Sequence, residues 1–205
     1  MVLRAVITAD IVNSTRLSGS EVRKIIKHIE TVFAGHLIEF FRGDSFQVYL
    51  KVPAPALQMI LLARTGTIKI SGGVSDIKAS IGIDLVKLPL KQLSTASGNA
   101  FLISGRSFDR MSNEMKLTIA SNEKNEIVNT GLRLLSRFVD YLFRHMTAKQ
   151  AAAVFELLMN KTQVEAAKKL KKSQATIHKH IQSAGWPEME KLLTEYTILI
   201  KSINT

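Results

Sequence analysis

The chain has 205 residues, and its 46% hydrophobic and 22% charged residues are typical of a globular protein with one large domain or two small ones. No stretch approaches the roughly 18 consecutive apolar residues of a membrane-spanning helix, the N-terminus lacks an export-signal pattern, and the absence of cysteine excludes disulfides and fits a cytoplasmic protein. The net charge of +11 favours a polyanionic partner, because neutralised phosphates release counterions.

Strands and helices alternate over the first 122 residues. Residues 2–9 are apolar and β-branched as in a buried strand, and apolar side chains then recur at helical spacing up to residue 33, with Ser20 as the expected N-cap. Two apolar runs flank the turn residues 42–45, which predicts a β-hairpin. The pattern continues with a helix over 55–72, a strand over 76–86, a helix over 98–113 and a strand over 115–120.

This order of elements predicts an α+β fold, a ferredoxin-like α/β sandwich with its helices on one face of the sheet. The polar stretch "SNEKNE" follows, and the pattern is helical from there to the end. We therefore expect an α/β domain over 1–122, a connecting helix over 123–146 and an all-α domain over 147–205.

Two aspartates are candidates for a metal site. Asp10 ends the first strand and Asp44 lies at the hairpin tip, and pairing of these strands would bring the two carboxylates together. Like charges repel, and Mg²⁺ typically binds one or two carboxylates together with the phosphates of a substrate. The alternative is that Asp10 caps a turn and that Asp44 is an ordinary turn residue.

The C-terminal region predicts three short helices with N-caps at Thr147, Thr162 and Ser173. Between residues 160 and 180, six lysines face one glutamate, which makes this segment the most basic part of the chain. A small core between the second and third helices is expected from the apolar side chains Val164, Leu170, Ile177 and Ile181.

Four segments, "TADIVNSTRL", "RGDSFQVYL", "ASIGIDL" and "GNAFLISGRSFDRM", resemble in their order the motifs of class III nucleotide cyclase catalytic domains. The chain resembles more closely the SatD family of bacterial proteins, in which a cyclase-like domain precedes a helix-turn-helix. The resemblance implies that Asp10 and Asp44 bind Mg²⁺ or Mn²⁺ with a nucleotide. It also implies that Arg106 occupies the position of the arginine that stabilises the transition state.

Leu102 occupies the position of the cyclases' catalytic asparagine. Because leucine cannot donate a hydrogen bond, the pattern favours binding or sensing over catalysis. The turn after the first strand offers backbone N–H groups to a nucleotide's phosphates, from Asn13, Ser14 and Thr15.

Residues 146–186 resemble the helix-turn-helix of sigma-factor region 4, with Lys171 at the position of the turn glycine. In that fold the start of the third helix faces base edges in the major groove. The residues expected there are Gln174, Ala175, Thr176, His178 and Lys179, with Ser173 as the cap of the helix. Phosphate contacts are expected from Lys161, Lys171 and Lys172. The alternative is a helical bundle whose lysine face contacts protein.

The favoured interpretation is a regulator of transcription that binds double-stranded DNA, with a cyclase-like domain that binds a nucleotide and metal or mediates dimerisation. One alternative is an active metal-dependent nucleotidyl cyclase with a DNA-binding tail, and another is a component of a defence or mobile-element system. A homodimer is expected, since helix-turn-helix proteins commonly read two half-sites. Its candidate interface is the apolar stripe Leu132, Leu135, Val139 and Leu142, which could instead pack on the chain's own N-terminal domain.

Overall fold

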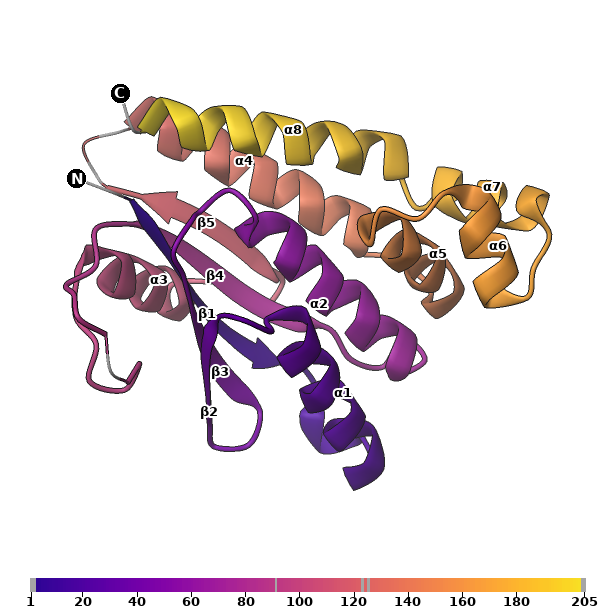
Figure 1. Ribbon diagram of the computed structural model, residues 1–205, viewed down its shortest axis with the longest axis horizontal. Helices are drawn as coiled ribbons and strands as arrows, with labels where there is room; N and C mark the ends of the chain where they lie inside the picture. The colour runs from indigo at the N-terminus through magenta and orange to yellow at the C-terminus, as the bar shows by residue number, and fades with distance from the viewer. Residues whose placement is uncertain (1–2, 91, 123, 125, 204–205) are drawn as a thin grey trace.

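A single five-stranded sheet organises the fold, with the strand order β2-β3-β1-β4-β5 (Figure 1). The computed structural model describes residues 3–90, 92–122, 124 and 126–203, so residues 2, 123 and 125 of the expected elements lie outside the described part. The strands are β1 (Arg4–Ile11), β2 (Leu37–Phe41), β3 (Ser45–Leu50), β4 (Ile77–Asp84) and β5 (Leu117–Ser121).

The first four strands are paired as a ferredoxin-like core requires. Each neighbouring pair among β2, β3, β1 and β4 is antiparallel, and β5 extends the sheet by pairing in parallel with β4. The hairpin between β2 and β3 turns through Arg42 and Gly43, which both have positive φ. The mixed α+β class predicted from the order of elements is confirmed.

Two helices, α1 (Gly19–Val32) and α2 (Ala56–Ile70), cover one face of the sheet (Figure 1). The N-cap of α1 is Ser18, and the expectation of Ser20 is wrong. The Ser18 hydroxyl accepts the Glu21 N–H, and the Glu21 carboxylate accepts the Ser18 N–H at 2.8 Å. This capping box satisfies two N–H groups at once, and it needs a glutamate or glutamine three residues after the cap.

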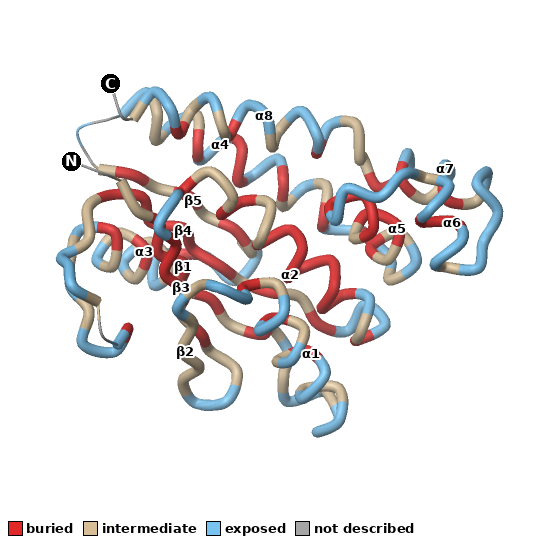
Figure 2. The backbone as a smooth tube through the Cα atoms, viewed as in Figure 1, coloured by how far each residue is buried: buried red, intermediate tan, exposed pale blue. Residues whose placement is uncertain are grey.

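The third helix, α3 (Asn99–Asp109), covers the opposite face of the sheet, so the expectation that all helices lie on one face is wrong. The close approach of α3 to β4 depends on Gly82, where a Cβ atom would overlap the backbone of Ala100 and Ser104. The Thr8 and Ser104 hydroxyls also lie within hydrogen-bond distance, 3.1 Å apart. Helices thus sandwich the sheet, and β1 lies largely buried between them (Figure 2).

Five further helices complete the described chain: α4 (Glu126–Phe143), α5 (Ala148–Leu158), α6 (Gln163–Leu170), α7 (Gln174–Ser183) and α8 (Trp186–Ile203). Helix α4 packs along β5, α8 runs beside α4, and α5 packs against α2 (Figure 1). None of the helices in the described ranges is long and apolar enough to cross a membrane. The boundaries of the expected domains, at residues 122 and 146, stay predictions.

The apolar stripe of α4 faces the interior of the chain. Leu132, Leu135 and Val139 are each 5% exposed or less and belong to the main core together with residues of β5 and α8, and Leu142 is partly buried against that core. The expectation that this stripe forms a dimer interface is wrong, because its side chains are already covered by this chain. The alternative, packing on the N-terminal part, is confirmed.

A buried arginine ties α2 to β4, β5 and α4. Arg64 is 1% exposed, and its guanidinium donates to both carboxylate oxygens of Asp76, at 3.0 and 2.7 Å, and to Asp140 at 2.8 Å. The second oxygen of Asp140 accepts the backbone N–H groups of Lys116 and Leu117. Burial alone would lower the pKa of Arg64, but the two carboxylates hold that pKa above its usual value.

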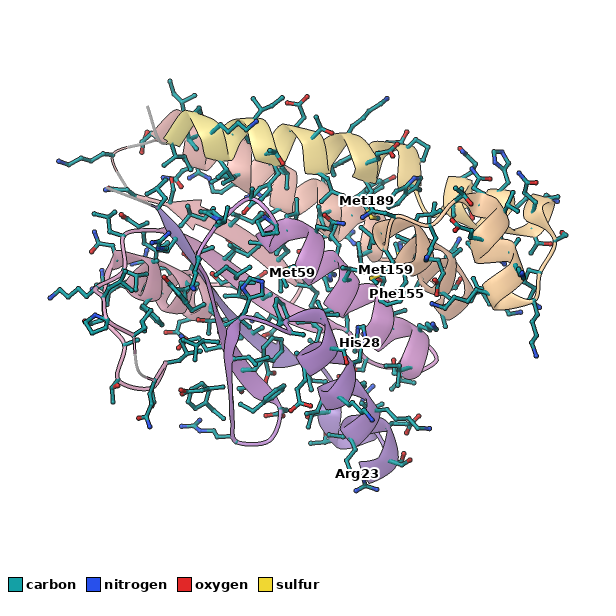
Figure 3. The ribbon with its side chains drawn as sticks, viewed as in Figure 1. Arg23, His28, Met59, Phe155, Met159 and Met189 are labelled. Carbon is teal, nitrogen blue, oxygen red and sulfur yellow. The ribbon has the colours of Figure 1, made fainter. Side chains whose placement is uncertain are left out.

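A histidine marks the junction of α1, α2 and α5. The rings of His28 and Phe155 meet edge to face with their centroids 5.5 Å apart (Figure 3). The imidazole lies against α2, 3.1 Å from the Leu62 carbonyl, and a Cβ atom at Gly66 would overlap the ring. Glycine therefore makes room for the histidine between the helices.

Candidate functional site

The three short C-terminal helices begin where the sequence predicts. The hydroxyl groups of Thr147, Thr162 and Ser173 each accept the backbone N–H three residues further on, at the start of α5, α6 and α7. Each of these caps satisfies a helix N–H that would otherwise lack a partner.

The turn between α6 and α7 uses a lysine in the left-handed conformation. Lys171 has φ 52° and ψ 48°, and the following N–H, of Lys172, donates to the Ala167 carbonyl at 3.0 Å. Glycine is the usual residue in such a helix end because it has no Cβ atom to clash. Lys171 therefore closes the turn in the way the sequence resemblance predicts, at some cost in conformational energy.

A small second core holds α5, α6 and α7 together, built from Ala153, Leu157, Ala166, Ala167, Ile177 and Ile181. Leu170 packs at its edge as expected. Val164 does not contribute and is 61% exposed, so that expectation is wrong. It lies in the first turn of α6, about 200° round the helix from the buried Ala166.

One face of α7 is turned to solvent. Ile177 and Ile181 are buried, His180 between them is half-buried, and Gln174, Ala175, His178 and Lys179 are exposed. Thr176 is half-buried and donates its N–H to the cap Ser173. Lys171 and Lys172 are exposed directly before the helix, so the structure brings these expected DNA-contacting residues together at one end of α7.

Lys161 lies apart from this group. It precedes α6, whereas Lys171 follows it, and it lines a hollow of about 750 Å³ with Trp186 and Glu190 of α8. Another lysine of α6, Lys169, is engaged with Glu156, whose carboxylate is fully buried and lies 2.9 Å from the ammonium group. Lys161 and Lys169 therefore do not belong to the exposed group at the start of α7.

The second candidate site lies where β1 ends. The Asp10 carboxylate accepts the Ser45 hydroxyl at 2.9 Å, and the Asp44 carboxylate accepts the Ser14 hydroxyl at 2.7 Å. The Ile11 N–H donates to the Asp44 carbonyl, which joins the strand end to the hairpin. Burial raises the pKa of Asp10, the Ser45 hydroxyl lowers it, and the nearby charge of Asp44 raises it again.

These two carboxylates can supply part of a divalent cation site. Each uses one oxygen for a serine hydroxyl, and no other described residue donates to the second oxygen. Among the described residues no group of three or more His, Cys, Asp and Glu side chains could hold a metal ion. Mg²⁺ commonly binds through one or two carboxylates and completes its shell with water and phosphate oxygens, so the donor set fits such an ion when a phosphate ligand is present.

The expected phosphate-binding turn adjoins these carboxylates. Asn13 has a left-handed backbone (φ 58°) and precedes the short 3-10 helix Ser14–Arg16, and its side-chain amide donates to the Val74 carbonyl. The hydrogen bond from Ser14 to Asp44 joins this turn to the hairpin. Asn13, Ser14 and Thr15 therefore lie beside the aspartates, as the sequence predicts.

Arg106 lies away from these two carboxylates. Ala100 and Ser104 are the residues of α3 that face the sheet, and Arg106, about 200° further round the helix from Ser104, is exposed. It lines a hollow with Asp84 and residues of β5 and α4, and no described contact joins it to Asp10 or Asp44. The structure thus does not bring Arg106 to these carboxylates within one chain.

Several polar residues of this hollow were not singled out from the sequence, among them Asp84, Arg110 and Arg133. They come from β4, α3 and α4, so only the tertiary fold brings them together. The one available signal was Asp84, an acidic residue at the end of the apolar strand "IKASIGID".

No family model matches the chain, and neither does any curated protein. Among solved structures, the chain is similar to the crystal structure of the guanylyl cyclase Cya2, with 14% sequence identity and a TM-score of 0.43. The match covers 58% of this chain and 74% of that one. So distant a likeness carries no argument about activity, and the function has to be argued from the sites themselves.

Proposed function

We propose that the chain binds double-stranded DNA through α7 and acts as a regulator of transcription. The observation that carries the proposal is the exposure pattern of α7. Its two isoleucines anchor it to α5 and α6, and Gln174, Ala175 and His178 are left free for a partner. A helix held this way by a preceding short helix is the arrangement that enters a major groove in helix-turn-helix proteins.

The chemistry of the exposed residues supports the same proposal. Gln174 can pair with the N6 and N7 atoms of adenine, and the methyl group of Ala175 can pack on a thymine methyl. Lys171 and Lys172 can neutralise phosphates at the mouth of the groove. Among the described residues, no acidic side chain forms an ion pair with either lysine.

A charge-reversal pair tests the proposal. In Lys171→Glu/Lys172→Glu, binding to duplexes of every sequence should weaken, and the slope of log affinity against log salt should flatten by about 1 for each phosphate that is no longer neutralised. The matched control is Lys24→Glu/Lys27→Glu, which makes the same change in net charge on the exposed surface of α1. Fluorescence anisotropy would measure both, and equal affinities of the two variants would contradict the proposal.

Base readout has its own test. Gln174→Ala should leave the salt dependence unchanged and should lose about 1–3 kcal/mol of discrimination at one or two base pairs. Selection from a random duplex library, with the natural chain and the variant side by side, would measure this. An unchanged selected sequence would refute the role of Gln174.

A second candidate function is nucleotide binding at Asp10 and Asp44 with Mg²⁺ or Mn²⁺, in a cyclase-like domain. The juxtaposition of the two carboxylates with the turn at Asn13, Ser14 and Thr15 supports it. When bound, the ion would hold the nucleotide's phosphates between the carboxylates and the turn. Leu102 offers no hydrogen bond where cyclases use an asparagine, which supports binding without turnover over the alternative of an active cyclase with a DNA-binding tail.

Thermal shift tests this second function. A nucleoside triphosphate with Mg²⁺ or Mn²⁺ should raise the melting temperature by mass action, and Asp10→Asn should abolish the shift. Asp109→Asn is the control, because Asp109 is an exposed aspartate of α3 outside the site. The absence of any shift would leave Asp10 as a turn residue, and cyclic nucleotide product would establish the enzyme instead.

A further inference from the structure

A polar hollow opens at the β5 edge of the sheet, between α3, β5 and the first half of α4. Its volume is about 490 Å³, within the range of about 300–1,000 Å³ that small-molecule sites occupy. The side chains that define its character are Asp84, Asn99, Arg106, Arg110, Asn129 and Arg133. Three arginines, each exposed to solvent, therefore line one cavity.

These arginines have no carboxylate partner among the described residues. None of the ion pairs between described residues involves Arg106, Arg110 or Arg133. Within the described ranges, the one side-chain hydrogen bond of Arg133 goes to the Thr130 hydroxyl of its own helix. Three like charges around a cavity repel one another, and an anion between them removes that repulsion. The planar guanidinium group also matches the geometry of phosphate oxygens.

A second and independent feature is the carboxylate of Asp84. This residue is 5% exposed and lines the same hollow. One of its oxygens accepts the Leu85 N–H at 2.6 Å, and the other is buried without a hydrogen-bond partner. A buried carboxylate oxygen left without a donor is costly, so a ligand that brings a hydroxyl or amino donor would satisfy it.

The part of the lining that joins β5 to α4 is already fixed in place. The Asn129 side-chain oxygen accepts the Ser121 N–H at 2.7 Å, and its amide group donates to the Asn122 carbonyl at 3.0 Å. These bonds anchor the start of α4 to the end of β5. The cavity is therefore preorganised, which lowers the entropic cost of binding.

We propose that this hollow binds a phosphate ester that carries hydroxyl or amino donors, such as a mononucleotide or a sugar phosphate, without a metal ion. The phosphate lies among Arg106, Arg110 and Arg133, and a donor of the organic part satisfies Asp84. The site is separate from Asp10 and Asp44, and it uses residues of α4 that lie outside the expected cyclase-like domain.

Calorimetric titration of the full chain in the presence of EDTA tests the proposal, with AMP, GMP, ribose 5-phosphate and inorganic phosphate as probes. At least one ester should bind, and more tightly than inorganic phosphate. Arg133→Gln should weaken binding of that ester at least tenfold. Arg137→Gln, an exposed arginine one turn further along α4 that does not line the hollow, should leave it unchanged.

Two further variants identify the site. Asp84→Asn should weaken the ester, because the hydroxyl or amino donor of its organic part binds that oxygen, and should not weaken inorganic phosphate, since the change removes a negative charge beside an anion. Asp10→Asn should leave ester binding in EDTA unchanged, which separates this site from the metal-dependent one. No binding of any probe, equal binding of ester and phosphate, equal weakening in Arg133→Gln and Arg137→Gln, or abolished binding in Asp10→Asn would each overturn the proposal.

Discussion

Replacing Asp140 with alanine should destabilise the protein more than almost any other single change at a polar residue. The Asp140 side chain is 14% exposed and the Arg64 side chain 1%, so water compensates little for the loss. The change removes one charge-assisted hydrogen bond to Arg64 and the acceptor of the Lys116 and Leu117 N–H groups.

The expected loss is about 4 kcal/mol of unfolding free energy. All three lost hydrogen bonds end on the charged Asp140 carboxylate, and at the lower end of the usual range each contributes about 1.5 kcal/mol, which sums to about 4–5 kcal/mol. That result lies inside the range of about 3–5 kcal/mol that follows when one partner of a buried pair is removed. Asp76 still pairs with Arg64, which keeps the loss from being larger.

Urea denaturation followed by far-UV circular dichroism measures this loss as a lower midpoint with an unchanged slope. Asp109→Ala is the control, since Asp109 is exposed on α3, and it should change stability by less than about 0.5 kcal/mol. A loss below about 1 kcal/mol in Asp140→Ala would contradict this expectation, because the buried network would then contribute no more than a surface ion pair.

Three other predictions concern local structure. Gly66→Ala should destabilise the fold by well over about 1 kcal/mol in thermal denaturation, because its methyl group would overlap the His28 ring; a neutral effect would contradict that packing. Burial lowers the pKa of His28, so the unfolded chain takes up the proton first and stability should fall as pH decreases below about 6.5. His28→Gln should reduce that fall, although His36, whose pKa burial also lowers, keeps part of it; an unchanged pH profile would count against this assignment. Lys171→Val should cost about 1–2 kcal/mol because a β-branched residue is strained at φ 52°, and Lys171→Gly should not.

The sequence predicts the helices and strands well, because the spacing of hydrophobic residues follows directly from which side chains are buried. The helix expected over 55–72 is α2 (Ala56–Ile70), and the expected hairpin is β2 and β3. The N-cap of α1 was within reach of sequence reasoning, since Ser18 and Glu21 have the spacing of a capping box.

Placement in space was less accessible to sequence reasoning. Periodicity says that a helix has an apolar face but not which neighbour covers that face, so α3 and the stripe of α4 were open to more than one packing. Gly82 determines the position of α3 through close packing, and its sequence context "SIGID" does not distinguish that role from a bulge. The hollow lined by Arg106, Arg110 and Arg133 is formed by β4, β5, α3 and α4 together. No local sequence pattern links residues so far apart in the chain.

The claim that α7 binds DNA is tested most directly by titrating the ¹⁵N-labelled chain with a duplex of about 20 base pairs and following its amide resonances. Binding through α7 predicts the largest shift changes at residues 171–179, with residues 19–32 of α1 unaffected, and no such changes in Lys171→Glu/Lys172→Glu. Changes confined to other surfaces, or none at low salt, would contradict it.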